Sequence, residues 1–232
     1  MKTQIVSFAA ALLAMGTAIA TTPAQTADMS ATYTVTFNGT WSKATHPIEY
    51  PKGAHFSGLI GATHTDGYVL FKVGKVATRG LKNLSEHGQH SPFDKEIRAA
   101  IRAGTAGTLI ETSPIFGPPG TSSATFKVDA RYPMVSLAAM IAPSPDWFAG
   151  VANVRLYQNG QWVMRRTITV YAYDAGTDDG RNYQAADKES KPWKAVRLND
   201  SRHFKKNGKR VAVGTLTFER VASPAQQGMM KN

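Results

Sequence analysis

The chain has 232 residues, with 27 Lys+Arg against 16 Asp+Glu and no cysteine. Its 42% apolar and 19% charged residues are typical of a globular domain and exclude a largely disordered chain. The lack of cysteine excludes disulfides, thiolate metal sites and a cysteine-borne lipid anchor, so a core, with or without a bound metal ion, must hold the fold.

The N-terminal residues have the pattern of a secretory signal peptide. Lys2 precedes the apolar run "IVSFAAALLAMGTAIA", and Ala18-Ile19-Ala20 forms a small-x-small cleavage site. We expect a signal peptide over 1–20, with cleavage as late as residue 27, and an exported protein, periplasmic or secreted. A membrane anchor is less favoured because the run is Ala-rich and barely long enough to span a bilayer. No transmembrane segment is expected after signal removal.

The remaining chain predicts one domain over 28–222 and a flexible tail over 223–232. Its expected strands are 31–38, 67–74, those near 124–130 and 134–142, and 210–221. One helix is predicted over 91–104, with Ser91 as cap, Pro92 in the first turn and Gly104 at the end. Short strands with a single helix indicate an all-β, antiparallel β-sandwich with that helix in an inter-strand connection.

Asn159-Gly160 predicts a hairpin, because this pair is the strongest short-range signal for a two-residue turn. With those two as the loop, paired positions sum to 319, so residue 146 faces residue 173. Asp146 then lies beside Asp174 at the far end of the hairpin, within about one residue of register. Asp178 follows one loop-turn later.

Three carboxylates from neighbouring loops, Asp146, Asp174 and Asp178, are therefore expected at one end of a hairpin. Hard oxygen ligands in flexible loops suit Ca²⁺, which takes 6–8 oxygens. The spacing is not that of an EF-hand. The alternative is plain turn chemistry, since Asp and Gly are turn formers and acidic loops are often just solvated.

The sequence also resembles the spondin-N domain family over nearly the whole mature chain. The resemblance begins at "YTVTFNGTWSKATHPIEYP" (33–51) and is most specific at "MIAPSPDWFAGV" (140–151) and "YDAGTDDG" (173–180). It implies a C2-like β-sandwich with bound Ca²⁺. The family's calcium-binding carboxylates fall on Asp146, Asp174 and Asp178. Asp179 stands where the family often has Ser, as a second-shell acceptor or one more exposed charge.

Other candidate sites receive less support. His46, His55 and His64, with Asp66, invite a metal or hydrolase interpretation, but imidazoles in β-domains more often satisfy local hydrogen bonds. No G-x-S-x-G or H-E-x-x-H motif is present, so no enzyme is expected. The four tryptophans are expected to pack in the core and hairpin rather than to form a glycan-stacking platform.

The basic segment 188–210 has two interpretations. It is either a solvated loop region, which we favour, or a contact for a polyanion, with Lys205, Lys206, Lys209 and Arg210 as candidate residues. Nucleic acid is not expected as a partner of an exported chain.

Two function classes follow. The first is a non-catalytic, calcium-binding module that acts in extracellular or cell-surface binding or adhesion, with an unknown ligand. The second is a calcium-assisted binder of polyanions (acidic polysaccharide, lipopolysaccharide or lipid headgroups) through the acidic loops and the 188–210 segment.

Overall fold

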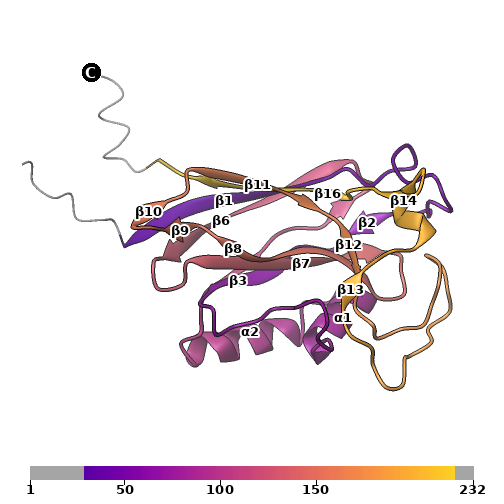
Figure 1. The fold of residues 1–232 in the computed structure, drawn as a ribbon, viewed down its shortest axis with the longest axis horizontal. Helices are drawn as coiled ribbons and strands as arrows, with labels where there is room; N and C mark the ends of the chain where they lie inside the picture. The colour runs from indigo at the N-terminus through magenta and orange to yellow at the C-terminus, as the bar shows by residue number, and fades with distance from the viewer. Residues whose placement is uncertain (1–28, 223–232) are drawn as a thin grey trace, which may run out of the picture.

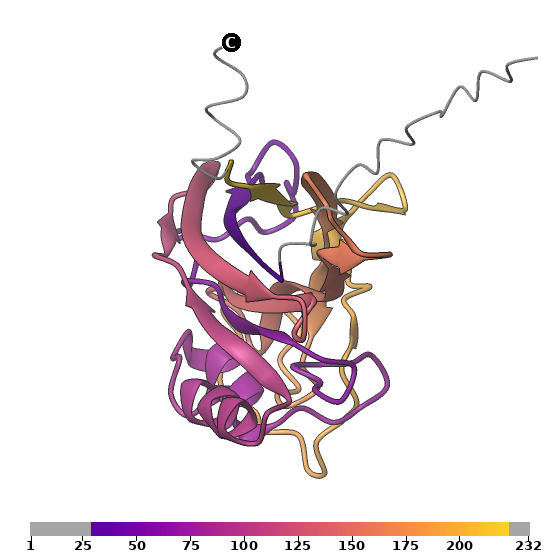
Figure 2. The same cartoon turned by 90° about the vertical axis from the view of Figure 1, so that its left-hand side faces the viewer.

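The computed structural model of the protein describes residues 29–222, so the expected signal peptide and C-terminal tail lie outside the described residues. Two antiparallel sheets face each other, and two helices cover the outer face of the larger sheet (Figures 1 and 2). The described part of the chain therefore has three layers. The expected antiparallel β-sandwich is confirmed.

The smaller sheet has the strand order β11-β16-β1-β6. Its strands are β1 (Ser30–Gly39), β6 (Gly120–Asp129), β11 (Arg165–Val170) and β16 (Gly214–Arg220). In β1, Tyr33, Val35 and Phe37 are buried and alternate with more exposed residues. This period of two places one apolar face on the core.

The larger sheet runs β13-β12-β8-β7-β2-β5, and β3 joins β4 to β7. Its strands are β2 (His55–Phe56), β3 (Ile60–His64), β4 (Ala106–Glu111), β5 (Ile115–Phe116), β7 (Met134–Ala142), β8 (Trp147–Arg155), β12 (Ala172–Asp174) and β13 (Arg197–Leu198). All nine residues of β7 are buried, because one face meets the smaller sheet and the other meets the helical layer.

The helical layer holds α1 (Arg79–His87) and α2 (Phe93–Arg102). Sequence reasoning predicted only α2. Gly104 follows α2 with a φ of 72°, as predicted, but Pro92 rather than Ser91 is the N-cap, and it has no side-chain cap bond. The missed helix α1 begins after Thr78, whose hydroxyl accepts from the Leu81 amide, and it ends at the left-handed Gly88.

Two apolar clusters fill the spaces between layers. The first lies between the sheets and includes Trp41, Phe56 and Phe218. The second lies between the larger sheet and the helices and includes Phe93 and Ile97. Trp41, Trp147 and Trp162 are buried as expected, whereas Trp193 is only partly buried and belongs to neither cluster.

The strand predicted at 67–74 is wrong. This segment is an irregular connection between β3 and α1. Leu70 and Phe71 are buried in the second cluster, where the Phe71 ring lies 5.0 Å from the Phe148 ring. These two adjacent side chains pack into the core from an irregular segment, so the apolar residues of this stretch do not form a pleated strand.

The Asn159-Gly160 turn is confirmed, with positive φ at both residues. It joins β9 (Tyr157–Gln158) to β10 (Gln161–Trp162), whose pairs sum to 319 as predicted. The chain then leaves its partner. β11 pairs with β16 in the smaller sheet, and only β12 returns to pair with β8. The hairpin therefore links the two sheets.

The last short elements follow β13. They are the 3₁₀ helix η1 (Arg202–Phe204) and the two-stranded ribbon β14 (Lys205–Lys206) and β15 (Lys209–Arg210). This ribbon carries the four residues proposed for polyanion contact.

Candidate functional site

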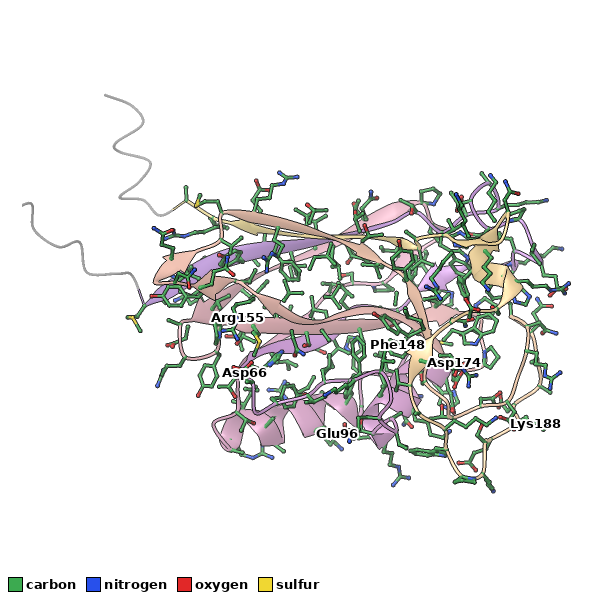
Figure 3. All side chains as sticks on the ribbon, viewed as in Figure 1. Asp66, Glu96, Phe148, Arg155, Asp174 and Lys188 are labelled. Carbon is green, nitrogen blue, oxygen red and sulfur yellow. The ribbon has the colours of Figure 1, made fainter. Side chains whose placement is uncertain are left out.

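The acidic loops meet where β8 begins and β12 ends. Asp174 pairs in register with Trp147, and the Ala175 amide donates to the Asp146 carbonyl at 3.1 Å. Asp174 and the Asp66–Arg155 pair lie in opposite halves of the molecule along its long axis (Figure 3). The predicted meeting of Asp146 and Asp174 is therefore confirmed. The register is shifted by two residues from the prediction, because pairing is interrupted where β11 crosses to the other sheet.

Asp146 is the centre of this cluster and is fully buried. Its Oδ2 accepts the Thr177 amide at 2.7 Å and the Asp178 amide at 3.2 Å. Its Oδ1 is buried and has no hydrogen-bond partner among the described residues. An unpaired buried carboxylate oxygen is costly unless something compensates it, so this atom calls for a proton, a water molecule or a cation.

Asp174 and Asp178 are each 8% exposed and are held by their own loops. Asp174 accepts from the Gly176 amide at 3.0 Å and from Arg197 at 2.7 Å. Asp178 accepts from the Gly180 and Lys188 amides, both at 2.6 Å. These bonds fix the carboxylates and leave acceptor capacity on their oxygens, since each oxygen has two lone pairs.

Burial and, to a smaller extent, the nearby Asp174 and Asp178 carboxylates raise the pKa of Asp146 to about 7, against the lowering effect of the two amides. In the absence of a cation, a substantial share of the molecules at neutral pH therefore carries a proton on Asp146. The three aspartates form an electrostatically coupled cluster rather than three separate solvated charges.

The donor chemistry of this cluster fits a hard cation, because it offers carboxylate oxygens and an unpartnered Oδ1. It is not a preassembled cage. Within residues 29–222 no group of three or more His, Asp or Glu side chains stands close enough to hold a metal ion by itself. The residues that would hold Ca²⁺ are Asp146, Asp174 and Asp178, supplemented by main-chain carbonyls or water.

Asp179 points to different partners. Its Oδ1 accepts from Ser190 at 2.6 Å and from Lys194 at 2.5 Å, and these bonds lower its pKa. Its role as a second-shell acceptor stays a prediction. The Lys194 ammonium already neutralises its charge.

Sequence reasoning missed Gly176 and Thr177. The Thr177 amide donates the shortest of the hydrogen bonds to Asp146, and the Thr177 hydroxyl lies 3.5 Å from the same Oδ2. Gly176 has a φ of 76°, and a Cβ there would meet the Lys194 carbonyl oxygen at 2.4 Å. A backbone amide leaves no mark on residue type, so only the glycine within "DAGTDD" offered a signal.

Most cations of the basic segment are paired with carboxylates. The pairs are Lys191–Glu189, Lys194–Asp179, Arg197–Asp174, Arg202–Glu49, Lys205–Asp200 and Arg210–Asp200. Lys206 and Lys209 face each other across the β14–β15 ribbon, are exposed, and have no ion pair with any described residue. The positive charge of this segment is therefore largely compensated.

The three singled-out histidines are engaged locally. His64 lies 2.8 Å from both the Thr65 carbonyl and the Ser136 hydroxyl. His46 Nδ1 lies 2.9 Å from the Thr45 hydroxyl, and His55 Nδ1 lies 2.8 Å from the Gly53 carbonyl. Asp66 pairs with Arg155. These contacts do not assemble a metal or hydrolase centre from the histidines.

Within residues 29–222, no helix is long and apolar enough to cross a membrane.

Comparison with known proteins gives consistent matches. The Spondin_N family model matches residues 31–209. Spondin-2 of Homo sapiens is 35% identical over 160 residues, which cover 67% of this chain and 48% of that protein. Spondin-1 of Mus musculus is 32% identical over 213 residues, which cover 85% of this chain and 26% of that protein. The chain thus spans about half of the first relative and a quarter of the second.

Proposed function

This chain belongs to the Spondin_N family, and from that premise we propose that it is an exported, non-catalytic module for binding or adhesion outside the cell or at its surface. Asp146, Asp174 and Asp178 hold Ca²⁺ in this proposal. The ion stabilises the loops at one end of the larger sheet.

The observation that carries the calcium site is the buried Asp146 carboxylate. Its Oδ1 has no partner among the described residues, and burial together with two further carboxylates raises its pKa. A bound Ca²⁺ would supply positive charge where this cluster has an excess of negative charge. The main-chain bonds from Thr177 and Asp178 hold Asp146 in place.

Calcium should then be linked to folding, because Asp146 and Asp174 meet only when β8 and β12 pair. Extracellular calcium modules have dissociation constants on the order of 10⁻⁴–10⁻³ M. At a hundredfold excess over such a constant, the folded state gains roughly 2.7 kcal/mol. We expect calcium to raise the melting temperature by several degrees, and magnesium to do less because it requires a smaller octahedral shell.

Thermal melts in chelator and in roughly 10–100 mM calcium, the hundredfold excess over such a constant, test this proposal. Asp146→Asn, Asp174→Asn and Asp178→Asn should each lose most of the calcium-dependent shift. Asp179→Asn is the matched control, because it removes the same charge from the same loop but its carboxylate is paired with Lys194. If the wild-type melting temperature is the same in chelator and in calcium, the proposal is wrong and the aspartates serve only to form turns.

The second function, polyanion binding through the basic segment, is less well supported. Asp200 forms ion pairs with both Lys205 and Arg210, which leaves only Lys206 and Lys209 of the four candidate residues without an ion pair among the described residues. The shared carboxylate lowers the net positive charge that these residues present to a polyanion. The adhesion module with a calcium site is therefore the function we favour.

A further inference from the structure

The connection between β3 and α1 presents apolar side chains to solvent. Val69, Val73 and Val76 are 51%, 53% and 57% exposed, and they are three of the seven large hydrophobic residues that are exposed among residues 29–222. Scattered exposed apolar residues are normal, but three within eight positions of one connection concentrate apolar side chains on this part of the surface.

This connection is held rigidly despite its exposure. Leu70 and Phe71 anchor it in the second core, and the Gly74 amide and Lys75 carbonyl both bond to Val196, at 2.9 and 2.8 Å. Residues 72–76 are all exposed, with a turn at Gly74. The segment crosses the front of the helical layer (Figure 1), so the turn is a fixed projection of the surface.

Cations interleave with the valines. Lys72, Lys75 and Arg79 are exposed, and none has an ion pair with any described residue. The sequence contains no Asp or Glu between Asp66 and Glu86. This surface therefore keeps its positive charge, unlike the 188–210 segment. We call Val69, Lys72, Val73, Lys75, Val76 and Arg79 the valine–lysine surface.

A shallow cavity of about 300 Å³ adjoins this surface. Its apolar lining includes Tyr68, Phe71 and Tyr173 beside Val69 and Val73, and its polar lining is Asp66, Lys72 and Asn153. The Asp66 carboxylate is paired with Arg155, so it does not neutralise the lysines of the surface. The surface thus combines a projecting turn, unpaired cations and a partly apolar margin.

We propose that the valine–lysine surface docks on an anionic lipid bilayer, with the cations at the phosphates and the valines at the boundary between headgroups and acyl chains. A bilayer offers negative charge above an apolar layer, which matches this alternation on a convex turn. An acidic polysaccharide would match the cations but provides no apolar layer for the valines. The proposal concerns a different surface from the calcium site and does not depend on it.

Vesicle co-sedimentation in chelator tests the proposal independently of calcium. The purified protein should bind phosphatidylcholine vesicles that contain phosphatidylglycerol and should bind pure phosphatidylcholine far less. Lys72→Ser with Lys75→Ser should weaken this binding on the order of twentyfold, because each lysine near an anionic leaflet contributes about fivefold. Val73→Ser with Val76→Ser should weaken it about tenfold through lost apolar burial.

Two matched controls separate this surface from general charge and apolarity. Lys206→Ser with Lys209→Ser removes the same charge from the β14–β15 ribbon, and Phe116→Ser removes a side chain that is 76% exposed elsewhere. Both should bind like the wild type. Equal losses from the two lysine pairs, or no loss from the valine pair, would overturn the proposal.

A spectroscopic readout follows from the absence of cysteine, because one introduced thiol can be labelled selectively. An environment-sensitive dye on Val73→Cys should shift to the blue on anionic vesicles, whereas the same dye on Phe116→Cys should not. If the wild-type protein does not bind anionic vesicles, the proposal is wrong, and a protein becomes the favoured partner of this surface.

Discussion

At the residue scale, the burial of His46 makes the stability of the fold depend on pH. It is 1% exposed, and burial lowers its pKa from 6.5 to about 4. The folded state then resists protonation of this imidazole while the unfolded state accepts it. The unfolded state binds more protons between about pH 6.5 and 4, so this residue makes stability fall as the pH drops through that window.

We therefore predict that His46→Leu reduces the acid sensitivity of the fold. The wild type should lose up to about 3 kcal/mol between pH 7 and pH 4.5 through this residue, and the variant should lack that part of the loss. Urea denaturation of both proteins at the two pH values measures the difference. All other titrating groups, Asp146 included, are common to both proteins. Equal pH-dependent losses would contradict the assignment.

The sequence predicted which residues form the acidic cluster but not their environment. Asp146, Asp174 and Asp178 were brought together by hairpin arithmetic and by family resemblance. The complete burial of Asp146 and its unpartnered oxygen do not follow from register or resemblance, because both features depend on where the chain packs after Asp174. Residue types specify the donors, and tertiary packing specifies their charge state.

At the element scale, the loop after β12 depends on Gly176. Gly176 and Gly160 both have a φ near 75°, a left-handed conformation that costs a residue with a Cβ about 1 kcal/mol. A Cβ at Gly160 meets nothing within 4 Å, whereas one at Gly176 meets the Lys194 carbonyl oxygen at 2.4 Å. The two glycines therefore form a matched pair.

We predict that Gly176→Ala destabilises the protein by roughly 2 kcal/mol or more, whereas Gly160→Ala costs about 1 kcal/mol. The added cost at Gly176 arises because the backbone around Lys194 must move, which also displaces the Thr177 amide from Asp146. Chemical denaturation of the two variants measures the difference. Equal losses would show that this loop can relax around the methyl group.

Elements with a strict period were predictable, and elements defined by tertiary contacts were not. The alternation of apolar and polar residues in 31–38 predicted β1 correctly, because one face of that strand is buried. The segment 67–74 is also rich in β-branched and aromatic residues, but only Leu70 and Phe71 in it are buried. The helix α1 carries a readable signal in its flanking residues, the N-cap Thr78 and the left-handed Gly88. The crossing of β11 to the other sheet leaves no signal in the sequence, because the residues on both sides of the Asn159-Gly160 turn are rich in β-formers.

At the scale of the whole molecule, the central strand β7 couples the two cores. Leu137 and Ala139 belong to the core between the sheets, whereas Ala138 between them belongs to the core under the helices. Successive residues of a strand point to opposite faces, so neither core can lose its packing without disturbing the same strand. The described part of the chain should therefore unfold as one unit.

A substitution that creates a cavity beneath the helices tests this coupling. Ile97 of α2 is fully buried in the second core, and Ile97→Ala should cost about 2–5 kcal/mol. Helical circular dichroism reports α1 and α2, whereas three of the four tryptophans, Trp41, Trp147 and Trp162, lie in the first core and report it by fluorescence. Because β7 is shared, both signals should shift to lower urea together and keep one midpoint. If the helices melted first while the fluorescence transition stayed at its wild-type midpoint, the helical layer would be an independent unit resting on a self-sufficient sandwich.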